Sequence, residues 1–547
     1  MKRKFTSVIL TGFMSFLISG QVYSQTINAQ KKASTGSLHY IDSLKKIALS
    51  KSETDYAVPS FTLFRKALIS SDSDTGIQII ASLTNGLNSL QPKESPYSIV
   101  ININEDPTSR IGFNWFTNAG ITGGKVQIIS GVMKSPTQFI KPLKTTFAKV
   151  DSVNNLNYST SSNKLLTLTG IPDNSKKSYM SNKALVTGLK PNTTYSFRVG
   201  SEGNWSSIGT FKTAPRNKKE FSFIYTTDPQ ANTDEMFDIS QKTTHAAHNM
   251  YPGASFWICC GDHVQSSGSS NSEWEWEQFF LTQQDILLHI PFAPVLGNHD
   301  KSANRNFTSH FNTDSTDFDF ALSTTPGSVY SFVYSNTLFL ALSFEDYSKP
   351  EYLEALAKWI RNQVVIHPDV KWRIVYYHKT IYTGSTSHQD DSDSKVVRDR
   401  IAPLFDSLKI DLALQGHDHI YEVIGPVKNK ALVPGSVSKQ LQVTADTREN
   451  VTGKLNGVFD VSNGTLYFLN NSAGRKKYEP LNKFRMDTIE TKLDIKNYFG
   501  LFTGRFGQTG RPTYSNIKVT RDTITIATYE VSNEGNASLF DKIKLVK

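Results

Sequence analysis

Apolar and polar residues alternate in short runs between Pro96 and Pro215. The alternation is clear from Tyr97 to Asn104, and it returns from Ile111 to Phe116 and from Tyr195 to Val199. A period of two is the mark of a strand with one buried face, and short strands separated by turn residues are typical of β-sandwiches. The pattern therefore predicts a β-sandwich over residues 96–215.

The pattern changes after residue 217, where apolar runs begin to alternate with helical stretches. Strands are expected at Phe221–Thr227, Ser255–Cys260, Phe292–Leu296, Thr337–Phe344, Trp372–Tyr377 and Ile410–Leu414, and helices at Glu235–Asn249, Glu273–Ile290, Tyr352–Val365 and Lys395–Leu408. Such alternation predicts a layered α/β domain over residues 218–547. The tail, Tyr514–Thr520 and Thr523–Tyr529, alternates again, and we expect it to add closing antiparallel strands.

The first residues have the pattern of an export signal. Lys2, Arg3 and Lys4 precede an apolar stretch from Val8 to Ile18, and small residues follow up to Ser24. The apolar stretch is about half of the ~20 residues that a membrane span needs. Residues 1–24 are therefore interpreted as a signal peptide, and the mature protein as exported, periplasmic or secreted, without a membrane span. Residues 25–95 are read as a helical lead-in of unknown role.

Composition narrows the class of protein. The 547 residues are 38% hydrophobic and 11% aromatic, enough for several packed cores, which excludes a largely disordered chain. Only Cys259 and Cys260 are present, which excludes a disulfide scaffold and a cysteine-based metal site. They are neighbours on a strand and point to opposite faces, so free thiols are expected. The net charge of +10 is scattered, so no specific nucleic-acid partner is predicted. Oligomeric state is not readable.

Polar side chains follow five of the six predicted strands. These ends are Asp228-Pro229-Gln230, Gly261-Asp262-His263, Gly297-Asn298-His299-Asp300, His378 and Gly416-His417-Asp418-His419. Ligands of open α/β sheets bind outside the carboxyl ends of the strands, so these groups are expected to converge. Glycines at 261, 297 and 416 are expected to let the backbone turn sharply there.

Carboxylates, an amide oxygen and imidazoles together are ligands for Zn, Mn or Fe. One ion rarely takes so many protein ligands and keeps an open position. Two ions about 3.5–4 Å apart, bridged by one carboxylate, would use all of them and activate a water molecule. The pattern is that of a dinuclear hydrolase.

With these motifs the sequence resembles the calcineurin-like metallophosphoesterases, and more closely the purple acid phosphatase relatives. The run from Leu189 to Val199, with Trp205 and Phe211–Pro215, is similar to a fibronectin type III-like domain, which implies a scaffold or spacer in front of the catalytic domain. The implied fold is this β-sandwich followed by a layered domain of the αββα type, with the C-terminal strands closing it.

The resemblance also implies a role for each residue. Asp262 would bridge two metal ions, Asp228 and His419 would hold the first ion, and Asn298, His378 and His417 the second. His299 would not bind metal but would steady the phosphoryl oxygens or protonate the leaving alkoxide. The activity implied is that of an acid phosphatase-like phosphoric ester hydrolase, in which a metal-bound hydroxide attacks a small phosphorylated substrate.

Two positions depart from the family pattern. Gln230 stands where a His is common, and its amide oxygen is either a weak ligand or a hydrogen-bond partner. Gln265 stands where purple acid phosphatases carry the tyrosine that colours their iron, so no ferric–tyrosinate centre is expected, and Fe is one option beside Zn and Mn.

The remaining polar residues near the motifs receive supporting roles. Asp300 and Asp418 are expected to orient neighbouring imidazoles, or else to bind metal. Arg305 and His263 are candidates for substrate contact. Histidines away from the motifs are interpreted as structural: His245, His248, His289, His310, His367 and His388.

The function expected is therefore hydrolysis of phosphate monoesters. A phosphodiesterase or nuclease of the same superfamily is the enzymatic alternative, and an exported binding protein with a decayed site is the non-catalytic one. The segment Val433–Gly510 is expected to contribute loops near the site.

Overall fold

The computed structural model describes residues 95–103, 105–158, 175–266, 272–300, 306–313, 318, 323, 325–385, 387–388, 391–437, 456–479 and 502–547. The predicted signal peptide, nearly all of the lead-in and Arg305 lie outside these residues. Among the described helices, none combines the length and apolar character that crossing a membrane requires.

The N-terminal part is a β-sandwich, as predicted. One face is made of β1 (Tyr97–Asn102), β2 (Ile111–Asn118), β6 (Ser175–Val186) and β5 (Lys149–Tyr158), and the other of β4 (Lys144–Phe147), β3 (Lys125–Ser130), β7 (Thr194–Ser201), β8 (Asn204–Trp205) and β9 (Gly209–Lys212), with a short 3₁₀ helix η2 (Pro136–Gln138). Apolar residues that alternate along the strands, such as Phe113 and Val126, are fully buried between the two faces.

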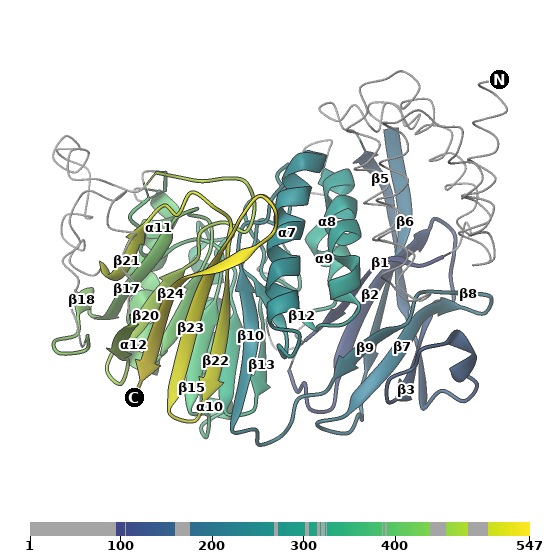
Figure 1. Cartoon of the computed structure of the whole chain (residues 1–547), viewed down its shortest axis with the longest axis horizontal. Helices are drawn as coiled ribbons and strands as arrows, with labels where there is room; N and C mark the ends of the chain where they lie inside the picture. Colours follow the sequence, from purple (N-terminus) through teal and green to yellow (C-terminus); the bar gives the residue numbers. More distant parts are fainter. Residues whose placement is uncertain are drawn as a thin grey trace, which may run out of the picture.

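The sandwich is joined to the next domain through a shared sheet. Strand β1 pairs in parallel with β12 (Phe292–Pro294), which belongs to the α/β domain. The side chain of Asn102 spans the junction, because its Nδ2 donates to the carbonyl of Phe292 at 3.1 Å and its Oδ1 accepts from the backbone N–H of Asn312 at 2.9 Å. The expected spacer is therefore an extension of the α/β domain's own sheet (Figure 1).

The α/β domain consists of two sheets packed face to face between helices. Within the described residues, the first sheet continues through β11 (Trp257–Cys259), β10 (Glu220–Thr226), β22 (Thr513–Thr520), β23 (Thr523–Val531), β24 (Ala537–Val546) and β19 (Asn456–Asp460). The second contains β13 (Tyr330–Tyr334), β14 (Thr337–Ala341), β15 (Trp372–Tyr376), β16 (Leu412–Gln415), β20 (Thr465–Leu469), β17 (Tyr421–Lys428), β18 (Ala431–Leu432) and β21 (Phe502–Gly507).

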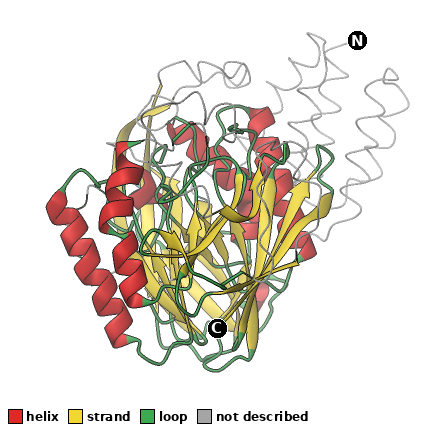
Figure 2. Cartoon of the chain, turned by 90° about the vertical axis from the view of Figure 1, so that its left-hand side faces the viewer, coloured by secondary structure: helices red, strands yellow, loops and turns green. Residues whose placement is uncertain are grey.

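Helices cover the outer face of each sheet (Figure 2). The first sheet packs on α7 (Asp234–Met250), α8 (Ser272–Leu287) and α9 (Asn306–His310), and the second on α10 (Pro350–Ile366), α11 (Ser392–Arg400) and α12 (Ala402–Leu408). Residues such as Phe223, Phe339 and Leu414 fill the core between the sheets. This arrangement confirms the predicted αββα sandwich.

One predicted helix is divided in two. The pattern suggested a single helix over Lys395–Leu408, but the chain forms α11 and α12 with a break at Ile401. Pro403 lies in the first turn of α12, where its missing N–H costs nothing, whereas inside a continuous helix it would remove a hydrogen bond. The two cysteines are free and buried, as expected.

Candidate metal centre

The predicted ligands lie at the carboxyl ends of five strands of the two sheets. Asp228 follows β10, Asp262 follows β11, and Asn298 follows β12, while His378 and His417 follow β15 and β16. Strands β10–β12 are parallel to one another, as are β14, β15, β16 and β20, so the ends of each set meet at one edge.

Three of these residues have φ angles that are unusual for residues other than glycine. The φ angles of Asp228, Asp262 and His417 are 53°, 51° and 74°. Left-handed conformations of this kind cost of order 1 kcal/mol or more each, and they persist where the surrounding fold enforces them. The sharp turns aim the three side chains back over the edge of the sheets.

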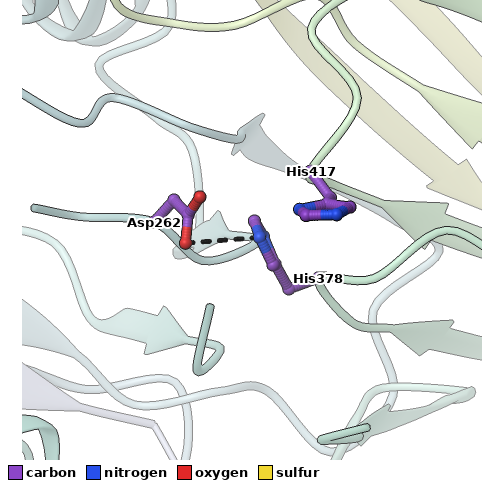
Figure 3. Close-up of side chains that lie close together, drawn as sticks. All are labelled: Asp262, His378 and His417. Atoms are coloured by element: carbon purple, nitrogen blue, oxygen red, sulfur yellow. Dashed lines mark ion pairs between the residues drawn. The ribbon is translucent and has the colours of Figure 1, made fainter. Parts of the chain in front are cut away.

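Asp262 and His378 form the centre of the cluster (Figure 3). Nε2 of His378 lies 3.3 Å from Oδ1 of Asp262 and 3.0 Å from Oδ1 of Asn298. Nδ1 of His378 is 2.8 Å from the carbonyl of Cys260, an acceptor, so Nδ1 carries the proton. In the neutral ring, Nε2 then presents its lone pair towards two oxygens.

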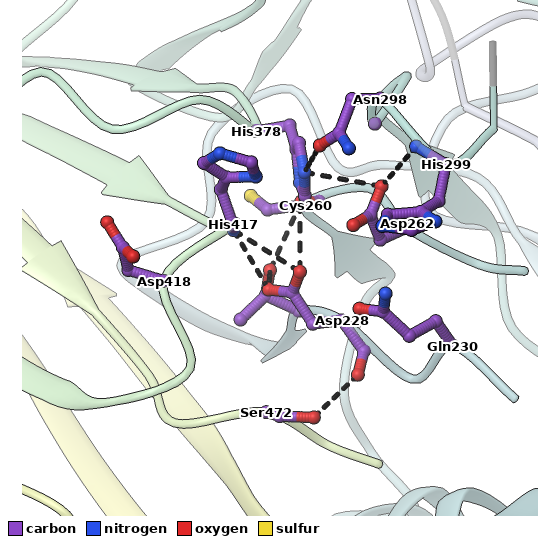
Figure 4. Close-up of polar contacts among 12 residues, drawn as sticks. Asp228, Gln230, Cys260, Asp262, Asn298, His299, His378, His417, Asp418 and Ser472 are labelled. Carbon is purple, nitrogen blue, oxygen red and sulfur yellow. Dashed lines mark hydrogen bonds and ion pairs between the residues drawn. The ribbon is translucent and has the colours of Figure 1, made fainter. Parts of the chain in front are cut away.

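Asp228 lies beside this centre, below His378 and His417 in Figure 4. Its Oδ1 lies 3.2 Å from Nε2 of His419, and its Oδ2 accepts from the backbone N–H of His417 at 3.0 Å. Both Asp228 and Asp262 are buried, with exposed fractions of 0% and 1%. The structure thus brings together all six predicted ligands.

The three glycines act in two different ways. Gly261 has a φ of 86°, as the predicted sharp turn requires. Gly297 and Gly416 have no left-handed φ and are needed for close approach instead. A Cβ at Gly297 would lie 2.2 Å from Oδ1 of Asp262, and a Cβ at Gly416 would lie 2.3 Å from the carbonyl of Cys260.

The chemistry of the donor set fits metal ions. Ligand atoms of Asp262, His378 and His417 all lie within 4.8 Å of one another. Several lone pairs converge with few protons between them, which is the arrangement that a cation satisfies. The buried atoms without a hydrogen-bond partner among the described residues include Oε1 of Gln230 and Nδ1 of His419 at this site. The Gln230 oxygen agrees with the weak-ligand reading of that position.

Asp262 and His378 shift each other's pKa values. Burial opposes charge on both groups, but their short contact keeps the pKa of Asp262 well below its usual range and raises the pKa of His378 to about 10. A metal ion and a proton compete for Nε2 of His378, so metal binding releases a proton.

His299 is positioned for a role other than metal binding. Its backbone N–H donates to Oδ1 of Asp262 at 2.8 Å, and its Nδ1 is 2.5 Å from the carbonyl of Gln265. Because Nδ1 is committed to an acceptor, Nε2 is the atom available to exchange a proton.

Asp300 and His263 hold the loops around the site in place. Oδ2 of Asp300 lies 2.8 Å from Nδ1 of His263 and accepts from the backbone N–H of Gly297 at 3.0 Å. Asp300 therefore orients an imidazole, as predicted, and also the loop that carries Asn298. His263 is fully buried among aromatic rings such as Trp276, so the substrate contact considered for it does not fit this position.

Asp418 lies outside the cluster. Its side chain is buried behind His417 and accepts from Oγ1 of Thr380 at 3.1 Å (Figure 4). Among the described residues its hydrogen-bond partners are hydroxyl groups, and its interaction with the imidazole of His388 is electrostatic.

Two rings near the centre were not expected from the sequence. His388 was interpreted as structural, yet its ring centroid lies 3.9 Å from that of His417, and its Nδ1 is 2.8 Å from Oδ2 of Asp391. Tyr478 stacks on His419 with ring centroids 4.4 Å apart. No strand precedes His388 immediately, so the strand-end pattern did not single it out.

Lys476, like His388 and Tyr478, lies near the centre and was not indicated by the sequence pattern. Burial lowers the pKa of its ammonium, opposed by the carboxylates of Asp262, Asp228 and Glu275, with which it interacts. It follows β20, a buried parallel strand whose apolar run, Leu466–Leu469, could have been recognised. The expected contribution of the 433–510 segment to the site is therefore observed in residues 470–479.

Comparisons with known proteins agree with this geometry. Residues 96–213 match the family model of the purple acid phosphatase N-terminal domain, and residues 221–421 match that of the calcineurin-like phosphoesterases. The resemblance drawn from the motifs is confirmed. The domain content is that of a metal-dependent phosphoesterase.

Individual relatives are distant. Two Mycobacterium tuberculosis proteins, both named as uncharacterized, are 21% identical over 328 residues, covering 54% of this chain and 58% of theirs. A purple acid phosphatase from yellow lupin (Lupinus luteus) seeds has a TM-score of 0.58 at 14% identity, covering 83% of this chain and 74% of that one. PhoD has a TM-score of 0.52 at 12% identity, covering 82% and 89%. At these identities the two structures show the shared fold.

Proposed function

We propose that this protein is an exported phosphatase that hydrolyses phosphate monoesters with two metal ions, Fe, Zn or Mn. Six residues would hold the ions: Asp228 and His419 the first, Asn298, His378 and His417 the second, and Asp262 both. When bound, the ions supply Lewis-acid activation of a water nucleophile and neutralise charge on the phosphoryl group.

The observation that carries the proposal is the convergence on Asp262. Residues that are more than 150 positions apart in the sequence, Asp262 and His417, place ligand atoms within 4.8 Å of each other and of His378. Burial of this many polar groups is costly unless they are compensated. A decayed site would have no reason to keep the complete set, which argues against the non-catalytic binding protein.

His299 has the geometry of a proton donor. Its ring is fixed through Nδ1, so that Nε2 can hold a proton for the leaving alkoxide while the backbone N–H holds Asp262 in place. Preference for a monoester rests on the purple acid phosphatase resemblance, and a phosphodiesterase is the outcome that a diester assay would reveal.

The proposal is tested by metal analysis combined with ester hydrolysis. The purified protein should contain metal and hydrolyse p-nitrophenyl phosphate faster than bis(p-nitrophenyl) phosphate, and a chelator should abolish both. Asp262→Ala should lose metal, whereas His299→Ala should keep it and lose about 10²–10⁴-fold in kcat. His289→Ala, on an exposed ring bonded to Thr210, is the control. A metal-loaded protein that hydrolyses neither ester would refute the function.

Export has its own test. If residues 1–24 are a signal peptide, N-terminal sequencing of protein recovered from outside the cytoplasm should begin near Gln25. An intact Met1 would contradict it.

A further inference from the structure

Residues 470–479, here called the 470–479 loop, lie across the proposed metal centre. On one side the N–H of Ala473 donates to the carbonyl of Thr227 at 2.8 Å, and Oγ of Ser472 donates to the carbonyl of Asp228 at 2.7 Å. On the other side the N–H of Tyr478 donates to the carbonyl of His419 at 3.2 Å. The loop is thus tied at both ends to the turns that carry the two ligands of the first ion.

Lys476 stands between these two attachments. It is three residues from Ala473 and two from Tyr478, so its Cα lies within about 11 Å of the Cα of Ala473 and about 7 Å of the Cα of Tyr478, the two residues that are bonded to the turns. Its side chain is half-buried, and its ammonium interacts with the carboxylates of Asp262 and Asp228.

The two basic residues next to Lys476 in the sequence have partners away from the centre. Arg475 is exposed and lies 3.4 Å from a carboxylate oxygen of Glu235, and the exposed Lys477 donates to the carbonyl of Gly510. Of the three consecutive cations Arg475–Lys477, Lys476 is the one that interacts with the carboxylates of the centre. The loop attachments place Lys476 beside the centre, and its charge acts on the two carboxylates there, whereas Arg475 and Lys477 have partners of their own.

An ammonium at this place has a specific consequence for substrate choice. A phosphate monoester carries nearly two negative charges at neutral pH, because its second pKa is about 6, whereas a diester carries one. Metal ions attract both kinds of ester. An additional fixed cation favours the ester with the additional charge and a further non-bridging oxygen.

We propose that Lys476 binds a non-bridging phosphoryl oxygen of the substrate and that it selects monoester dianions over diesters. The inference rests on the proposed phosphoesterase function, and it assigns to the 470–479 loop the selection between two classes of substrate.

The test compares Lys476→Gln with Lys477→Gln in the full, metal-loaded chain. Loss of one charge-assisted hydrogen bond should lower kcat/KM for p-nitrophenyl phosphate by about 10–100-fold and for bis(p-nitrophenyl) phosphate by less than about 3-fold. Lys476→Arg should restore part of the loss because it keeps the charge. Lys477→Gln should leave both rates unchanged.

Binding of inorganic phosphate, measured by calorimetry, separates this inference from the function on which it rests. Lys476→Gln should weaken phosphate binding by a similar factor at unchanged metal content. Active wild-type protein with equal losses on both esters, or with unchanged phosphate affinity in Lys476→Gln, would overturn the role of Lys476 and leave the function standing. If the wild-type protein hydrolyses neither ester, the proposed function is refuted. If Lys476→Gln then still binds inorganic phosphate more weakly than the wild type, phosphate binding by Lys476 is supported.

Discussion

Gly297 offers a direct test of how closely the centre is packed. A Cβ added there would lie 2.2 Å from Oδ1 and 2.3 Å from the backbone nitrogen of Asp262. Carbon contacts are normally near 3.5 Å, so Gly297→Ala has to push the two turns apart by about 1 Å. Overpacking of this kind costs about 1–3 kcal/mol of folding free energy. A shift of about 1 Å in a catalytic group costs about 10²-fold in rate.

The assay measures kcat/KM on p-nitrophenyl phosphate, bound metal and the free energy of unfolding for Gly297→Ala and Gly253→Ala. Both glycines lack a left-handed φ, but nothing lies within 4 Å of a Cβ at Gly253. Gly253→Ala should therefore be neutral or slightly stabilising, by up to about 1 kcal/mol. Gly297→Ala should be destabilised, should bind less metal and should lose about 10²-fold in kcat/KM.

The comparison has a clear refuting result. If Gly297→Ala keeps the metal content and rate of Gly253→Ala, then the position of Asp262 against Gly297 does not govern the centre. If stability falls while metal content and rate are retained, the crowding is relieved away from Asp262, and the predicted coupling between Gly297 and the centre is wrong.

Two further predictions concern buried polar groups outside the centre. Burial raises the pKa of Glu275 to about 7 from 4.5, although it accepts from the N–H groups of Gln265 and Ser266. The folded protein therefore holds a proton that the unfolded chain releases, so stability should fall by about 3 kcal/mol as the pH rises from 4.5 to 7. Glu275→Gln should lack this fall in denaturant titrations, and parallel curves for the two proteins would disprove the assignment. The side chain of Gln284 bonds both the N–H and the carbonyl of Ile99, where β1 bulges out of register. Gln284→Ala should therefore destabilise the folded protein by about 1–3 kcal/mol for each of these backbone groups that is left without a partner. An unchanged melting temperature would show that water replaces both bonds.

The placement of the centre could be read from local pattern. Apolar runs of strand length that end in Asp, Asn or His, as in Phe221–Asp228, define where a strand stops and which side chain stands there. Because parallel strands end at one edge, this local information predicted that all six ligands meet. The layered fold followed from the same alternation of strands and helices.

The hydrogen-bond partners of the polar side chains around the site could not be predicted from local pattern. Asp300 binds His263 rather than its neighbour His299, and Asp418 accepts a hydrogen bond from Thr380. Adjacent residues in a turn differ in direction through backbone angles that depend on the whole surrounding fold. Residue type and position therefore predicted which side chains converge at the centre, but not the hydrogen-bond partner of each neighbouring residue.

What the amino-acid sequence alone determined was the set of strand ends and the donor types that stand on them, since periodicity and residue chemistry are local properties. Tertiary structure decided the rest: the pairing of β1 with β12 that joins the two domains, the contact between the rings of His388 and His417, and the interaction of Lys476 with the carboxylates of the centre. These contacts join segments far apart in the chain. Their energies depend on distances that exist only after the sheets have packed.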